Sequence, residues 1–430
     1  MSAPTITQEV AVVRDTAPLP DVEQQGAILR TRPRPIPASW DPHWPGRAVF
    51  VTAIALVAWS LVAEPWALTG DALVYLQMAA GETVQAPFGF RVLAPWIAGI
   101  LPMAPVLAFE LLSWASLLVA AVALVAFARA SAEPAEADRR GWIVLAFFVT
   151  SYALVYYATA SVRVDPLALA LLAGCLALLA TGRSAGWVAL LMVPTALAHE
   201  TALVLVPILW LDRLCGAGLL GRRRLSWGAL LGITTVGAAA YLASRALLPA
   251  AAPEGQVSYL TTPSAILAHV IAHVGGVVKH GQRIYAAYGP ALVYAALAGV
   301  ALMRGRARLF VPGVLALGVG LTLLATDTLR VMAVLFPVVL LFAAQLVEVA
   351  WTRRGPALAV ALVGAQCVYA GVVFGHLRTF EGSRALQLAA IGVSAVAGLA
   401  ALVAARRPWR GALLPVEWAV EAPLSARDGA

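Results

Sequence analysis

The sequence has little charge. Only 12% of its 430 residues are charged, and a single lysine, Lys279, stands beside 29 arginines. Hydrophobic residues make up 61% and the mean hydropathy is +0.84, values that exclude an ordinary soluble domain. The apolar runs last roughly 15 to 25 residues and show no alternation, which is typical of membrane helices and not of barrel strands. We therefore predict an all-α fold, a polytopic transmembrane helical bundle.

Cysteine is also scarce. Cys175, Cys215 and Cys367 form an odd, scattered set, which excludes a disulfide framework or a metal knuckle. Residues 1–46 lack an early apolar segment of the kind that a cleavable signal contains and hold acids, prolines and the basic run RTRPRP instead. We predict a disordered cytoplasmic tail over 1–46, a membrane domain over 47–405 and a second cytoplasmic tail over 406–430.

The arginines indicate the topology. Charges, prolines and glycines divide residues 47–405 into about twelve spans. These are 47–66, 104–128, 141–160, 165–182, 186–198, 201–214, 227–248, 289–304, 309–325, 330–350, 356–375 and 385–405. With the N-terminus inside, 22 of the 30 basic residues fall on the inner side, which satisfies the positive-inside rule. We expect a multi-pass protein of the bacterial cytoplasmic (inner) membrane, with both termini cytoplasmic. The net charge of +8 then reflects topology, and no nucleic-acid partner is expected.

In this topology an unusual set of ionisable residues lies on the outer face. The most informative motif among them is in the first outer loop. In TGDALVYLQMAAGETVQAPFGFRVLAPW, residues 69–96, Asp71 and Tyr75 share one helical face at a spacing of four. We expect a short helix here that lies along the membrane surface, followed by a second piece in RVLAPWIAGIL. These are the juxtamembrane helices of the predicted fold.

An acid directly after the first span, with a tyrosine four residues later and small residues behind it, resembles the first outer loop of GT-C superfamily glycosyltransferases. That superfamily takes sugars from polyprenyl-phosphate carriers and includes bacterial relatives of protein O-mannosyltransferases and the lipid A aminoarabinose transferases. PTALAHETALVLVPILWL, residues 194–211, is similar to the short helix pair of the family. The resemblance implies transfer of a sugar to a glycan, lipid or protein acceptor, with Asp71 as the catalytic base or an acceptor-positioning acid.

The sequence departs from this family at two positions. Asp71 is followed by Ala72 instead of a second acid, and His199 replaces the usual lysine of the second motif. An isolated carboxylate is a poor site for a hard cation, so a divalent cation has weak support and we expect no metal ligands or other cofactor.

The predicted site combines a base with cations. A carboxylate can take the proton of an attacking hydroxyl, and arginine's planar fork suits the oxygens of a lipid phosphate leaving group. The residues expected to bind substrate are Tyr75, Arg91, Arg163, Asp165, His199, Glu200, Lys279, His280, Arg283, Asp327 and Arg330.

Each residue also has a structural interpretation. Asp71 can cap a surface helix, Arg91 can snorkel to the interface, and the ion pair in SVRVDP can close a tight turn. Three functions therefore remain open: a lipid-linked sugar transferase, a polymerase or ligase of envelope polysaccharide, and a twelve-span transporter or flippase. The absence of a persuasive repeat between the two halves of the chain, and the gathering of ionisable residues at the outer ends of the spans, disfavour the transporter.

Overall fold

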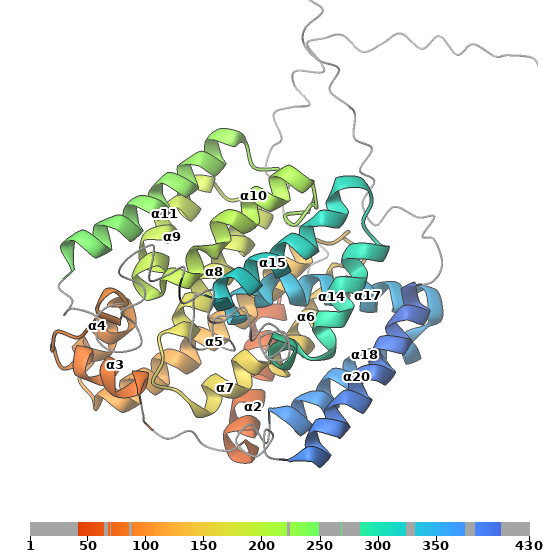
Figure 1. Ribbon diagram of the computed structural model, residues 1–430, viewed down its shortest axis with the longest axis horizontal. Coiled ribbons are helices and arrows are strands. Elements are labelled where there is room, and N and C mark those ends of the chain that lie inside the picture. Colours follow the sequence, from red (N-terminus) through yellow and green to blue (C-terminus); the bar gives the residue numbers. More distant parts are fainter. Residues whose placement is uncertain are drawn as a thin grey trace, which may run out of the picture. The chain divides into compact units, whose positions relative to one another are not determined.

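The computed structural model describes residues 42–63, 68, 70–85, 88–221, 224–248, 268, 284–323, 332–374 and 383–405. In these ranges helices form every element longer than one residue, so the all-α prediction is confirmed there. The predicted tails lie outside the described residues, apart from 42–46. Figure 1 shows the arrangement of the helices.

The elements follow one another as α2 (Trp44–Val62), α3 (Asp71–Ala79), η1 (Phe88–Phe90), α4 (Leu93–Ile100), α5 (Pro105–Ala130), α6 (Ala137–Val149), α7 (Tyr152–Thr159), α8 (Asp165–Ala180), α9 (Ala185–Ala198), η2 (Glu200–Val204), α10 (Leu205–Cys215), α11 (Trp227–Leu247), α14 (Pro290–Ala301), η4 (Gly305–Leu309), α15 (Phe310–Leu323), η5 (Ala333–Leu335), α17 (Phe336–Arg354), α18 (Pro356–Val373) and α20 (Arg384–Ala405). Here α denotes an α-helix and η a 3₁₀-helix.

Six helices in the described part are long and apolar enough to cross a membrane, or seven if the bent pair α6 and α7 is one span. The six are α2, α5, α11, α17 with its η5 turn, α18 and α20. A polytopic helical membrane protein is therefore supported. The predicted count of about twelve depends in addition on shorter helices, among them α8, α9 and α14.

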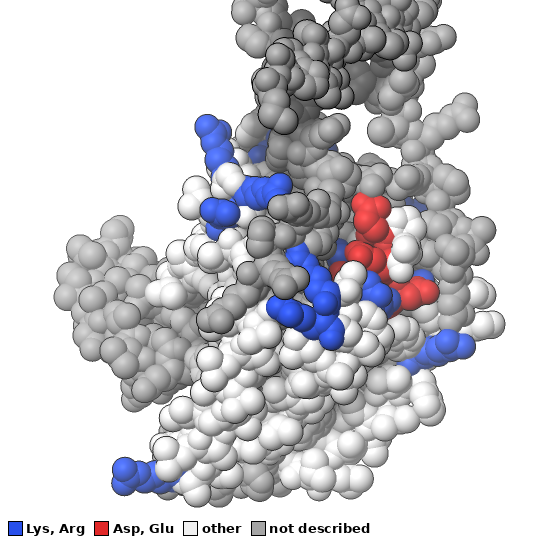
Figure 2. Space-filling view, turned by 90° about the vertical axis from the view of Figure 1, so that its right-hand side faces the viewer, with Lys and Arg blue, Asp and Glu red and all other residues white. Residues whose placement is uncertain are grey.

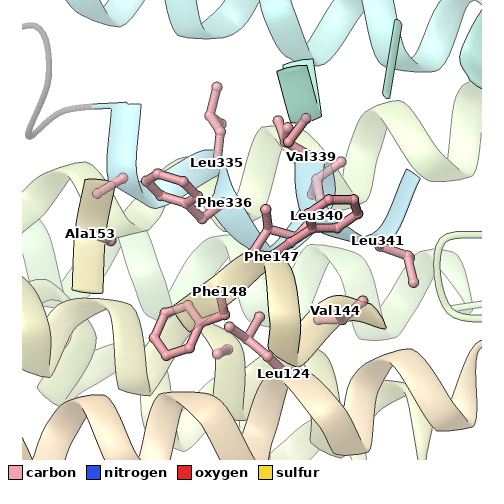
Figure 3. Packing of buried hydrophobic residues seen from close by; sticks show 14 of the residues in the cluster. Leu124, Val144, Phe147, Phe148, Ala153, Leu335, Phe336, Val339, Leu340 and Leu341 are labelled. Carbon is pink, nitrogen blue, oxygen red and sulfur yellow. The ribbon is translucent and has the colours of Figure 1, made fainter. Parts of the chain in front are cut away.

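The core lies where α17 packs against α14 and α6. Every residue of α17 from Phe336 to Ala350 is buried except Gln345. Figure 3 shows Phe147 and Phe148 of α6 packed among residues of α17 and Leu124 of α5. A helix that is apolar all round needs such complete enclosure, and α17 has it.

The peripheral helices leave apolar side chains exposed. α18 and α20 pack against each other but expose Val360, Val368, Leu388, Ile391 and Leu399. Figure 2 shows a broad lower area of uncharged residues on one face, with most of its charged side chains gathered above it. Exposed apolar side chains and an area without charge on a polytopic helical protein fit contact with lipid.

Two polar networks lie at opposite ends of α5, which is about 39 Å long at 1.5 Å per residue. Near its first turns, Ser113 donates a hydrogen bond to the backbone carbonyl of Ser161, just before α8. Past its last turn, Arg140 donates to the Ser131 carbonyl and pairs with the buried carboxylate of Glu348 in α17. The candidate site is at the first of these ends.

A break between α6 and α7 interrupts the predicted span 141–160. The two helices meet at an angle of 45°, and Ser151 caps α7 by accepting a hydrogen bond from the Leu154 N–H. The freed carbonyl of Thr150 accepts from Gln366 Nε2 at 3.3 Å, while Gln366 Oε1 accepts from the Ala291 N–H at 3.1 Å. The buried side chain of one glutamine in α18 thus provides hydrogen-bonding partners for a backbone carbonyl at the helix break and a backbone N–H at the start of α14.

Candidate functional site

Arg91 is the centre of the site. Its Nε and Nη2 donate to the two carboxylate oxygens of Glu200 at 3.0 and 2.5 Å, and its Nη1 donates to the Tyr75 hydroxyl at 3.0 Å. The side-on pairing of a guanidinium with a carboxylate is the strongest form of this interaction. These bonds join the loop after α3 to η2, two segments far apart in the sequence.

Two helices and a turn bring Tyr75 and Arg91 together. α3 begins at Asp71, and Tyr75 is fully buried one turn later, with the ring of Phe88 at its edge 5.9 Å away between centroids. The η1 turn then returns the chain, so that the Arg91 guanidinium lies 5.3 Å from the Phe88 ring centre. α4 packs on α3 at Gly99, where an added Cβ would lie 2.5 Å from the Ala79 carbonyl oxygen.

Asp71 lies on the same face of α3 as Tyr75, one turn earlier. It is half-buried, in contrast to the neighbouring loop acid Glu82, which is exposed. The predicted short helices in the first long loop are therefore present as α3 and α4, side by side at one edge of the bundle (Figure 1).

His199 continues the network on the other side of Glu200. His199 directly follows the last residue of α9 in an extended conformation, and its Nδ1 accepts a hydrogen bond from the Thr201 N–H at 3.2 Å. Nε2 then lies 3.7 Å from a carboxylate oxygen of Asp165, and Nδ1 lies 3.7 Å from Glu200. Because Nδ1 accepts from the backbone, a neutral His199 carries its proton on Nε2, facing Asp165.

Asp165 opens α8 with Pro166 in the first turn, a common helix start. Two residues earlier, Arg163 is buried and its Nε donates to the Tyr156 hydroxyl at 3.4 Å. Tyr156 stacks on Tyr152, with ring centroids 5.0 Å apart. The SVRVDP loop is therefore held against α7, and its acid is directed to the end of α9.

Charge and burial act in opposite directions at the central pair. Burial alone would raise the pKa of the Glu200 carboxyl, but the charges of Arg91 and His199 and the hydrogen bonds from Arg91 outweigh it, so this pKa lies below its ordinary value. For Arg91 burial alone would lower the pKa, while Glu200 and Tyr75 raise it above the ordinary value. Both groups are therefore charged at neutral pH.

The structure thus connects five of the predicted residues, Tyr75, Arg91, Glu200, His199 and Asp165, which we call the Arg91 network. Arg163 lies two positions before Asp165 in the sequence, and Asp71 lies one helical turn from Tyr75. Lys279, His280, Arg283, Asp327 and Arg330 lie outside the described residues.

Two residues near the network were not singled out from the sequence. Tyr156 receives the Arg163 bond, and Arg245, in the last turn of α11, lies 4.1 Å from the Phe90 ring centre and 4.3 Å from that of Tyr241. The rarity of outward arginines could have identified Arg245, whereas nothing in the local sequence distinguishes Tyr156 from Tyr157.

Among the described residues no group of three His, Cys, Asp or Glu side chains could hold a metal ion. Comparisons of the chain with protein-family models, with curated proteins and with solved structures found no significant match.

Proposed function

We propose that this protein is a membrane glycosyltransferase of GT-C type, which moves a sugar from a polyprenyl-phosphate carrier to a cell-envelope acceptor. The observation that supports it best is the Arg91 network, which joins the loop after α3, the start of α8 and the end of α9 at one end of the bundle beside Asp71. The network fixes the position of the helix that carries the proposed base.

The proposed topology has about twelve crossings of the cytoplasmic membrane, with both termini in the cytoplasm. It combines the long apolar helices with the shorter ones and with the positive-inside distribution of arginines. The Arg91 network then faces the extracytoplasmic side, and the Arg140–Glu348 pair lies at the cytoplasmic side.

In the proposed reaction the acceptor hydroxyl oxygen forms a bond to the anomeric carbon of the sugar while the bond from that carbon to the phosphate oxygen breaks. Asp71 takes the hydroxyl proton, and the lipid phosphate leaves with the bonding electron pair. Arg91, already neutralised by Glu200, serves here as a brace for Tyr75 and α3 instead of a free cation. His199 and Asp165 orient Glu200 and the end of α9.

The test is sugar transfer in membranes that contain wild type or Asp71→Asn, supplied with a panel of radiolabelled polyprenyl-phosphate sugars. Asparagine keeps the size of Asp71 and one acceptor oxygen but cannot take a proton, so we expect transfer to fall by at least about a hundredfold. Glu82→Gln, which removes an exposed acid from the same loop, is the matched control and should retain activity.

Full activity of Asp71→Asn at equal abundance would contradict the proposed base. A ladder of product lengths would indicate a polysaccharide polymerase instead of a single transfer. If no donor gave label above empty membranes while proteoliposomes showed counterflow of an unmodified substrate, the protein would be a transporter or flippase.

A further inference from the structure

Arg245 differs from the other arginines of the site in what surrounds it. Arg91 donates from Nε, Nη1 and Nη2 to Glu200 and Tyr75, and Arg163 donates to Tyr156 and to the Val162 carbonyl. The guanidinium of Arg245 lies over two aromatic rings, and its only hydrogen bond to a described residue is a long one, 3.5 Å from Nη1 to Ser244 Oγ. No described carboxylate neutralises it.

The two rings hold the guanidinium in place. Tyr241 comes one turn before Arg245 on α11, so the pair stacks along the helix. Phe90 comes from η1, whose other aromatic residue, Phe88, contacts both Arg91 and Tyr75. Contact with aromatic rings stabilises a cation without using its N–H donors. Arg245 is therefore held beside the Arg91 network, and within the described part of the chain only Ser244 accepts a hydrogen bond from it.

Its depth in the membrane suits a lipid phosphate. α11 has 21 residues and qualifies as a membrane span, and at 1.5 Å per residue it is about 31 Å long, the thickness of the hydrocarbon core. The last turn, which contains Arg245, is then at the level of the headgroups. Arginine's fork binds two phosphate oxygens at once, which a lysine cannot match.

We propose that Arg245, held by Phe90 and Tyr241, is a binding site for the phosphate of a polyprenyl-phosphate lipid. The lipid class rests on the proposed function, whereas the anion site itself rests on the contacts of Arg245. The phosphate group is bound by the guanidinium edge, and the prenyl chain enters the bilayer along the exposed apolar side of α11, where Leu231, Leu242 and Leu247 are exposed.

The experiment measures the Kd of decaprenyl phosphate for full-length protein in phosphatidylcholine nanodiscs by native mass spectrometry. Decaprenol, which lacks the phosphate, and inorganic phosphate are the comparison probes. For Arg245→Gln we expect the Kd of decaprenyl phosphate to rise at least about tenfold while decaprenol binding is unchanged. Arg384→Gln, which removes an exposed arginine from the start of α20, should bind as wild type does.

Wild-type affinity in folded Arg245→Gln would overturn the proposal, as would an equal loss of decaprenol binding, which would show a structural role. Inorganic phosphate that binds as tightly as decaprenyl phosphate would contradict the lipid as the source of the anion. If Arg245→Gln does not fold, Arg245→Lys decides the matter: a several-fold higher Kd supports the site, and an unchanged Kd contradicts it.

Failure of the Arg245 lipid-binding site can be distinguished from failure of the proposed sugar transfer. If transfer depends on Asp71 but Arg245→Gln binds the lipid normally, only the Arg245 site fails. If no transfer is found but binding depends on Arg245, the transferase fails and the phosphate site stands.

Discussion

Arg91 and Glu200, separated by 109 positions in the sequence, form a two-bonded ion pair in which the side chains are only 11% and 21% exposed. The pair joins the turn after α3 to the turn between α9 and α10. The Arg91 guanidinium also donates to the Tyr75 hydroxyl of α3, the helix that carries Asp71, so the pair is linked to that helix.

We expect Arg91→Gln and Glu200→Gln each to destabilise the protein by about 3 kcal/mol, because each leaves the other charge largely buried and unpaired. The double variant should be destabilised by less than the sum of the two, with a coupling of about 1 to 3 kcal/mol. Denaturant unfolding of wild type, both single variants and the double variant measures this. Strict additivity would show that the pair contributes nothing, and Arg384→Gln, an exposed arginine, should change little.

The lowered pKa of Glu200 predicts an acid-sensitive site. Its stabilising contribution is fully present above the ordinary glutamate pKa, about 4.3, and is lost as pH falls from there towards the lower pKa of the folded state. Wild type should therefore lose more thermal stability than Glu200→Gln between about pH 5 and pH 3. Melting curves across this range test the prediction, and a stability difference that stayed constant with pH would contradict it.

Gln366 carries a separate prediction at the break between α6 and α7. Gln366→Leu leaves the Thr150 carbonyl and the Ala291 N–H without their hydrogen-bonding partner in a buried region, so we expect a loss of about 2 to 4 kcal/mol. Gln345→Leu is the matched control, since Gln345 of α17 is half-buried and makes no side-chain hydrogen bond to a described residue. Equal stability of the two variants would show that the hydrogen bonds of Gln366 do not stabilise the protein.

A glycine supports the same region. Gly289, just before α14, has φ of +58° and its ideal Cβ would lie 2.4 Å from the Tyr369 ring, so both the backbone and the space require glycine there. Gln366 and Gly289 thus fix α14 against α18. Neither role follows from the local sequence, where each residue is only a break in an apolar run.

Local chemistry was sufficient to place many elements. The positions of charges, prolines and glycines predicted spans that begin at 165 and 227, and α8 and α11 begin at these residues. The sequence also predicted a short helix from Asp71, which α3 confirms. The predicted span 141–160 falls on α6 and α7, and the sequence alone did not indicate the 45° bend at Thr150 and Ser151 between them.

Composition, hydropathy and arginine placement by themselves determine that this is a helical membrane protein with an unusual first loop, because those properties depend on residue type and local order alone. Only the tertiary structure decided that Arg91 is paired with Glu200, that Asp165 faces His199, and that Arg245 has rings and no described carboxylate for neighbours. The physical reason is that one arginine can be neutralised by an acid while another arginine is left to bind a ligand. Which of the two occurs depends on the side chains that helices distant in the sequence bring near each arginine.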